Sequence, residues 1–175
     1  MTENRTTDDG GQRTIRLFPD YADTVLWIRE PIDYEDTGLS DELVAGMRAW
    51  EQFYYDSLDA DFNWVSAEAA RTFTEEGTRP AQSVSSEVGP RFLIEFASYE
   101  AGTETVRRRS AHPAENAEAE RAFAKLFDEI EVEDREIADY IRNNPGGKWT
   151  AYAPLSGTVF DPNPNWQTEA PSEDD

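Results

Sequence analysis

The sequence has no cysteine, one histidine (His112) and only two lysines (Lys125 and Lys148) among its 175 residues. Without cysteine, disulfides and thiolate chemistry are excluded, and one histidine cannot form a zinc site of the usual kind. No run of apolar residues approaches the roughly 20 that a membrane-spanning helix needs. The first residues also lack the apolar core of a secretory signal. We therefore expect a cytoplasmic protein that binds no cofactor or metal.

Negative charge is present in large and uneven excess. The chain carries 37 acids against 16 bases, which gives a net charge of −21. Between Asp20 and Asp61 there are 12 acids and only two bases, Arg29 and Arg48, so this stretch alone carries 2 − 12 = −10. Such a surface repels nucleic-acid phosphates and anionic membranes and attracts basic proteins. In the alternative explanation, a salt-adapted organism makes all its proteins acidic and the charge serves solubility alone.

The stretch from Leu39 to Leu58 has the clearest helical pattern in the chain. Its apolar residues recur at steps of three and four, which places them on one face of a helix: Leu43, Met47, Trp50, Tyr54 and Leu58. Ser40 is suited to cap the first turn, where Asp41 and Glu42 complement the helix dipole. Helical and strand spacing also predict that Trp27, Trp50, Tyr54 and Trp64 belong to the core. In the loop that follows, we expect Phe62 and Val65 to fold back onto this core.

The flanking segments predict strands at residues 14–18 and 24–28, joined as a hairpin, and a third strand at 91–97. A second helix is expected after Ser66, with interruptions at Gly77 and Pro80 and an end at Gly89-Pro90. This order of elements is typical of an α+β fold. We predict a small antiparallel sheet with helices packed on one face, followed by a C-terminal helical segment and an irregular tail.

The composition divides the chain into five segments. A connection without clear periodicity follows the core; it contains the basic run Arg107-Arg108-Arg109, which we expect to lie over the protein's own carboxylates. The last segment has too many prolines and glycines for a regular element. The expected segments are a disordered leader (1–12), the α+β core (13–98), the connection (99–113), the helical segment (114–143) and a Pro/Gly-rich tail (144–175), disordered over its last ~12 residues.

Several motifs of the first half also occur together in known proteins. These are IRLFPDY, VLWI, LSDELVAGMRAWEQFYYDSLD, FTEEG and EVGPRFLIEF. In this pattern the region from Arg13 to Ala97 resembles a loose group of short acidic bacterial proteins of unassigned function, some of which are similar to immunity proteins that neutralise toxins. The helix that contains Pro80 is continuous in that group, so this proline is a departure from it. The resemblance implies no catalytic residues.

No motif in the sequence defines an enzyme. The D-x-D-x-N run at Asp59 lacks the glycine and the glutamate that a calcium loop needs, since Trp64 and Ala70 stand at those positions. His112 lies in the connection and has no partner motif for nucleophilic catalysis. Two carboxylates could still act on a glycan, but only in a pocket of roughly 300 Å³ or more that holds both.

We therefore interpret the chain as a non-enzymatic acidic binding protein, an immunity-like inhibitor that masks the basic site of a toxin or nuclease. It would bind neither nucleic acid directly nor a membrane. One alternative is a structural protein that oligomerises through a helical seam from Phe123 to Tyr140; the other is a small two-carboxylate hydrolase. The predicted partner-binding residues are Asp33, Glu35, Asp36, Asp41, Glu42, Asp56, Asp59 and Asp61.

Overall fold

The computed structural model describes residues 12–143, 151–153 and 158–160. The predicted leader lies outside the described residues except for Gln12, as does most of the predicted tail. The chain divides into two compact units, one that ends at Glu129 and one that begins at Ile130. In the part of the chain that the structure describes, no helix combines the length and the apolar character needed to cross a membrane.

The first unit contains a four-stranded sheet. Its strands are β1 (Thr14–Leu17), β2 (Leu26–Trp27), β3 (Leu93–Phe96) and β4 (Val106–Arg108), in the spatial order β2-β1-β3-β4. The α+β class is confirmed, but the sheet is mixed: β1 pairs with β3 in parallel, and the other two pairs are antiparallel. The parallel pair arises because the chain between β1 and β3 crosses over through two helices, whereas an antiparallel pair needs only a turn.

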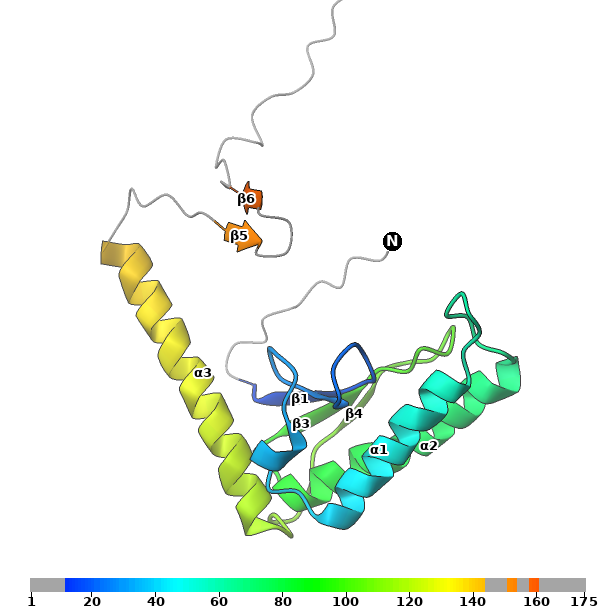
Figure 1. Cartoon of the computed structure of the whole chain (residues 1–175). Helices are drawn as coiled ribbons and strands as arrows, with labels where there is room; N and C mark the ends of the chain where they lie inside the picture. Colours follow the sequence, from blue (N-terminus) through cyan, green and yellow to red (C-terminus); the bar gives the residue numbers. More distant parts are fainter. Residues whose placement is uncertain (1–11, 144–150, 154–157, 161–175) are drawn as a thin grey trace, which may run out of the picture. The chain divides into compact units, whose positions relative to one another are not determined.

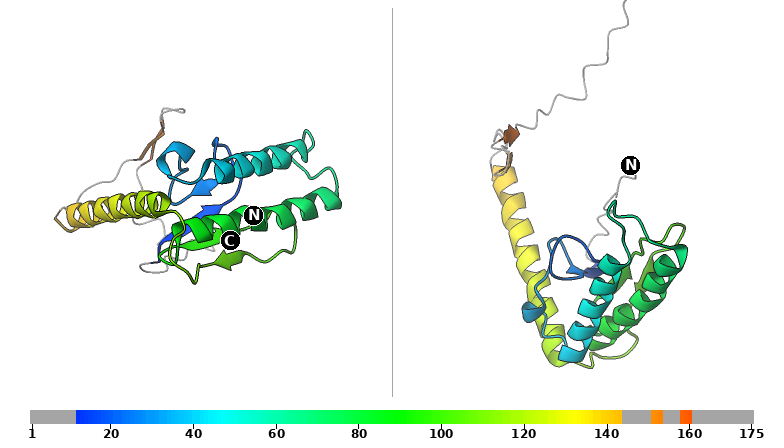
Figure 2. Two further views of the ribbon diagram at one scale, coloured as in Figure 1. Left: turned by 90° about the horizontal axis from the view of Figure 1, so that it is seen from below. Right: turned by 45° about the vertical axis from the view of Figure 1, so that its right-hand side comes forward.

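The described part of the chain also contains four helices. They are the 3₁₀ helix η1 (Tyr34–Asp36), α1 (Asp41–Asp56), α2 (Ala67–Val88) and α3 (Ala117–Asn143). The predicted cap is present, since Ser40 Oγ accepts a hydrogen bond from the backbone N–H of Leu43. Helices α1 and α2 run side by side and cover one face of the sheet (Figure 1, and Figure 2, left).

The two faces of the sheet differ in character because side chains alternate along a strand. Ile15, Leu17, Ile94 and Phe96 are buried toward the helices. The neighbours of these residues on the opposite face are only partly buried, and there Glu95 pairs with Arg107 across β3 and β4, with 2.9 Å between Oε2 and Nε. The basic run thus does contact one of the protein's own carboxylates, but within the sheet.

Helix α2 corrects the predicted interruption at Gly77 and Pro80, because it runs without a break through both residues. Gly77 is required by tertiary packing: a Cβ built on it would lie 2.5 Å from Cζ of Phe96 and 2.6 Å from Cζ2 of Trp50. The glycine lets α2 approach both rings, and burial of this contact outweighs the low helix propensity of glycine. Sequence pattern alone reads such a residue as a breaker.

Two further segments are more regular than expected. The connection 99–113 contains β4, which is stabilised as an edge strand by pairing with β3 and by the partly buried Val106. In the second unit, β5 (Ala151–Ala153) and β6 (Thr158–Phe160) form an antiparallel pair, where we expected no regular element. Each of these strands has only three residues and contains neither proline nor glycine, so the high content of both in the tail does not prevent pairing.

Three helix ends meet at the carboxylate of Glu87, in the last turn of α2. Its Oε2 accepts hydrogen bonds from the backbone N–H of Ser40 (3.0 Å) and from Nδ2 of Asn116 (3.0 Å), and its Oε1 accepts one from Ser40 Oγ. Asn116 also caps α3, since its Oδ1 accepts from the N–H groups of Glu118 and Ala119. One carboxylate therefore joins the N-termini of α1 and α3, where the helix dipoles favour negative charge.

We expect Gly77→Ala to lower the free energy of unfolding by about 1–3 kcal/mol, because two buried aromatic rings cannot both move away from the added methyl group. Urea unfolding of the full chain measures this. Gly46→Ala on α1 is the matched control, since the Cβ it would add has no atom within 4 Å other than those of its chain neighbours and of the backbone of its own helix. A Gly77→Ala variant as stable as the wild type would contradict the packing argument.

Removal of the Glu87 carboxylate in Glu87→Ala should cost about 1–3 kcal/mol, because donors from Ser40 and Asn116 lose their acceptor. The control is Glu75→Ala, an exposed position on the same helix. If both variants unfold at the same urea concentration, the junction contributes nothing to stability.

Candidate partner-binding surface

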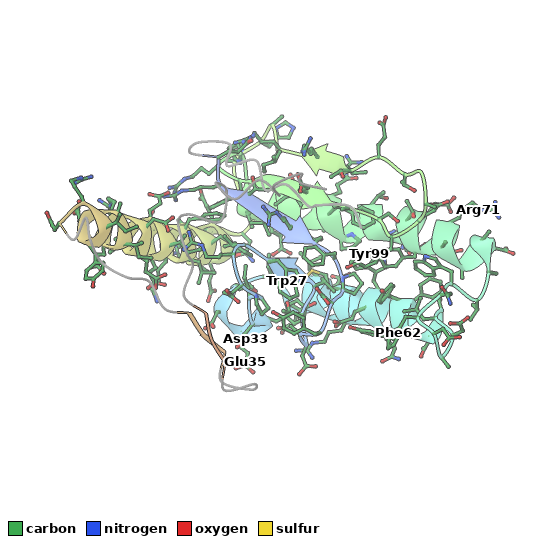
Figure 3. All side chains as sticks on the ribbon, turned by 90° about the horizontal axis from the view of Figure 1, so that it is seen from above. Trp27, Asp33, Glu35, Phe62, Arg71 and Tyr99 are labelled. Carbon is green, nitrogen blue, oxygen red and sulfur yellow. The ribbon has the colours of Figure 1, made fainter. Side chains whose placement is uncertain are left out.

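The eight predicted acids are all exposed, and the structure separates them into two groups. One group precedes and begins α1, and we call it the η1 acidic group: Asp33, Glu35, Asp36, Asp41 and Glu42. The other follows the end of α1, and we call it the loop acidic group: Asp56, Asp59 and Asp61. Figure 3 shows Asp33 and Glu35 at one end of α1 and Phe62, which neighbours Asp61, at the other.

The separation decides how the charges act. Helix α1 has 16 residues and is therefore about 24 Å long at 1.5 Å per residue. The Debye length at physiological ionic strength is about 8 Å, so exposed charges at the two ends are screened from each other. The sequence stretch with −10 thus forms two local negative fields, one at each end of a helix.

The loop acidic group is built around a tight turn. Oδ1 of Asp59 accepts hydrogen bonds from the backbone N–H groups of Asp61 and Asn63, both at 2.9 Å. This turn holds Phe62 at a positive φ of 60° and leaves the residue 79% exposed. The expectation that Phe62 and Val65 fold back onto the core is therefore wrong, because the capped turn directs Phe62 outward and Val65 is 59% exposed.

The predicted aromatic core is confirmed. Trp27 and Trp50 are buried, while Tyr54 and Trp64 are half-buried against the core. Trp50 stacks on Phe73 of α2 with 4.7 Å between ring centroids, and its Nε1–H donates to the carbonyl of Phe73 at 3.0 Å. Aromatic contacts of this kind add to the burial of the rings themselves, so α1 and α2 are held firmly at this point.

Two titratable groups beside this aromatic cluster have pKa values above their ordinary ones. Partial burial and the neighbouring Asp23 raise the pKa of the Glu51 carboxyl, although Arg48 opposes the shift. Burial together with Glu51 and Asp20 likewise raises the pKa of the Tyr55 hydroxyl. The carboxylates that add to the effect of burial in both shifts make the C-terminal half of α1 locally negative.

A groove of about 910 Å³ runs between α1 and α2. Apolar side chains line part of it, namely Leu43, Trp50, Phe53 and Pro80. Four carboxylates also line it, from Glu42, Glu76, Glu87 and Glu115, against a single base, Arg79. Of the predicted acids, only Glu42 contributes to this groove, which sequence reasoning did not identify.

Two residues that disfavour helices line this groove, one from each of the helices that form its walls. Gly46 lies within α1 and Pro80 within α2, and such residues cost a helix interior about 1 and about 3 kcal/mol relative to alanine. Packing explains Gly77, but it does not explain Gly46, around whose Cβ position there is open space. Pro80 has no N–H for the carbonyl of Glu76, which also lines the groove. The sequence feature that could have pointed to this groove is Gly46, a glycine inside a predicted helix.

The groove is large enough for a substrate, which was the condition set for a hydrolase. Its carboxylates, however, are not arranged as an acid–base pair shielded from water. Glu87 is engaged by Ser40 and Asn116, and Glu42, Glu76 and Glu115 are exposed. Within the residues that the structure describes, no group of three or more histidine, aspartate or glutamate side chains could hold a metal ion.

The helical seam predicted for the alternative, oligomeric protein lies on α3. Phe123 is fully buried, with its ring centroid 6.1 Å from that of Phe92, and Phe127 is buried beside the same ring. This part of the seam belongs to the core of the chain and is not available to a second copy.

The fold and surface define a small α+β protein with an acidic, grooved helical face. Comparison with protein families agrees with the resemblance found in the sequence. Residues 13–99 match the model of a family described as Serratia CdiI immunity protein-like, so this region of the chain is similar to that family. The resemblance to immunity proteins is thereby confirmed. A search of curated proteins found no match.

We expect Glu51→Gln to raise the free energy of unfolding at pH 7, by less than about 1 kcal/mol. The raised pKa means that the folded state holds its proton more tightly, so stability falls as pH rises from the unfolded value toward the folded one. The advantage of the variant should therefore vanish below about pH 4. Thermal unfolding at both pH values measures it, with Glu75→Gln as control; a pH-independent difference would contradict this origin.

Proposed function

We propose that the protein is a non-enzymatic inhibitor of the immunity type, which binds a basic toxin and masks its working surface. The observation that carries this proposal is the match of residues 13–99 to an immunity protein-like family. The acidic groups at both ends of α1 support it, because they suit a positively charged partner. A toxin that acts on nucleic acid would present such a surface, since it must bind phosphates.

Charge would act mainly on the rate of encounter. Exposed carboxylates steer a basic partner over about a Debye length and contribute less to the stability of the complex once it has formed. Short-range contacts by apolar side chains must then hold the complex, as buried anchors do at other interfaces. If the acidic surface served solubility alone, the association rate would not depend on which exposed acids are removed.

Neutralising the η1 acidic group tests this proposal. The five substitutions are Asp33→Asn, Glu35→Gln, Asp36→Asn, Asp41→Asn and Glu42→Gln. After the partner has been captured from native lysate and identified, we expect the variant to associate with it at least about tenfold more slowly at low salt, because steering is lost. Surface plasmon resonance measures the rate.

The matched control removes five exposed acids elsewhere, at Glu68, Glu75, Glu104, Glu129 and Glu133. It has the same net charge as the test variant. If the two variants associate at equal rates, total charge matters and the η1 acidic group does not. If neither variant differs from the wild type, the acidic surface serves solubility and the proposal loses its electrostatic basis.

A further inference from the structure

We infer that the groove between α1 and α2 is the docking site for an amphipathic helix of the partner, with an apolar face toward the groove and basic residues along its flanks. This inference rests on the proposed function, since it names the form of the partner surface. The lining of the groove combines Leu43, Trp50, Phe53 and Pro80 with four carboxylates. An apolar stripe flanked by positive charge complements both features.

The groove is kept open at a cost to the helices that form it. Gly46 weakens α1 and no neighbouring atom excludes a side chain there, yet any side chain would project into the groove. Pro80 weakens α2 on the opposite side of the same groove. Departures from local preference that no packing contact explains are expected at functional sites.

The groove is lined by helices, and this determines which secondary structure the bound partner segment can have. The lining residues come from α1, α2, Ser40 and Glu115, and a helix uses its interior backbone N–H and C=O groups for its own hydrogen bonds. An extended strand would therefore find no sheet edge to pair with, and recognition must proceed through side chains. A helix presents its side chains to a groove in this way, with anchors at steps of three and four.

The negative charge of the groove lining determines which residues the bound helix can carry beside its apolar face. Four carboxylates face one base, and Arg79 already pairs with Glu76, with 3.5 Å between Nη1 and Oε2. Glu42 and Glu115 stay exposed at the end of the groove where Ser40 also lies. Lysine or arginine on the bound helix would offset this excess, whereas an acidic helix would be repelled.

The test uses a labelled amphipathic peptide of about 18 residues that carries leucine on one face and lysine on the other. Fluorescence anisotropy measures its binding to the full chain at about 0.3 M NaCl, where non-specific attraction is screened. Gly46→Phe fills the groove. Its matched control is Ala45→Phe, at the preceding position of α1, which is exposed and does not line the groove.

We expect Gly46→Phe to weaken binding at least tenfold and Ala45→Phe to change it less than twofold. Thermal unfolding verifies that both variants fold, and Gly46→Ala should raise Tm by about 2–4 °C. Equal affinities of the two phenylalanine variants would overturn the inference, as would failure of the wild type to bind the peptide. Equal binding of a scrambled peptide of the same composition would also overturn it, because charge alone would then suffice.

These outcomes are distinct from failure of the proposed function. If Gly46→Phe leaves peptide binding unchanged while the variant without the η1 acidic group still associates slowly with the captured partner, the groove assignment is wrong and the inhibitor role stands. If peptide binding depends on Gly46 but the captured partner associates equally fast with the wild type and with the variant that lacks the η1 acidic group, the groove assignment stands without the electrostatic role.

Discussion

The packing of the Trp50 indole on one turn of α2 is the contact on which the rest of this structure depends. The ring stacks on Phe73, donates to the carbonyl of the same residue, and lies so close to Gly77 that a Cβ there would come within 2.6 Å of it. Phe96 of β3 meets the same place from the sheet, with its ring 5.5 Å from that of Trp50. A single aromatic side chain thus fixes the distance between α1, α2 and the sheet.

A polar junction fixes the other end of the same helix pair. Glu87 stands near the C-terminus of α2, where a negative charge is unfavourable to its own helix. It is tolerated because Ser40 and Asn116 bring the N-termini of α1 and α3 to its oxygens. Trp50 in the middle of α1 and Glu87 in the last turn of α2 thus hold the two helices side by side (Figure 2), and the groove lies between them.

The sequence allowed accurate prediction of features that are local. Helix α1 was predictable because its cap, its charged first turn and its apolar stripe agree with one another, and the stop at Gly89 has the positive φ of 77° that glycine accepts. The parallel pairing of β1 with β3 was not predictable, because residues some 80 positions apart decide it. The continuity of α2 was not predicted for the same reason: Gly77 is needed because the rings of Trp50 and Phe96, which are distant in the sequence, pack against it.

The candidate site shows the same division. That the acids of the η1 and loop groups are exposed was foreseeable, and so was their separation, because the sequence predicts a helix between them and each helical residue adds about 1.5 Å. The groove could not be predicted from the sequence, because it forms only when α1 and α2 pack side by side at a particular distance.

This matters for how such a protein could distinguish partners. A net charge of −21 attracts every basic protein, and screening over about 8 Å removes directional detail. Discrimination must therefore come from surfaces in contact, where shape and apolar burial decide. Gly46 and Pro80 weaken their helices at the groove, whereas no residue of the η1 acidic group has a positive φ. The position of that cost supports the two proposals made above, that the groove recognises the partner and that charge speeds the encounter.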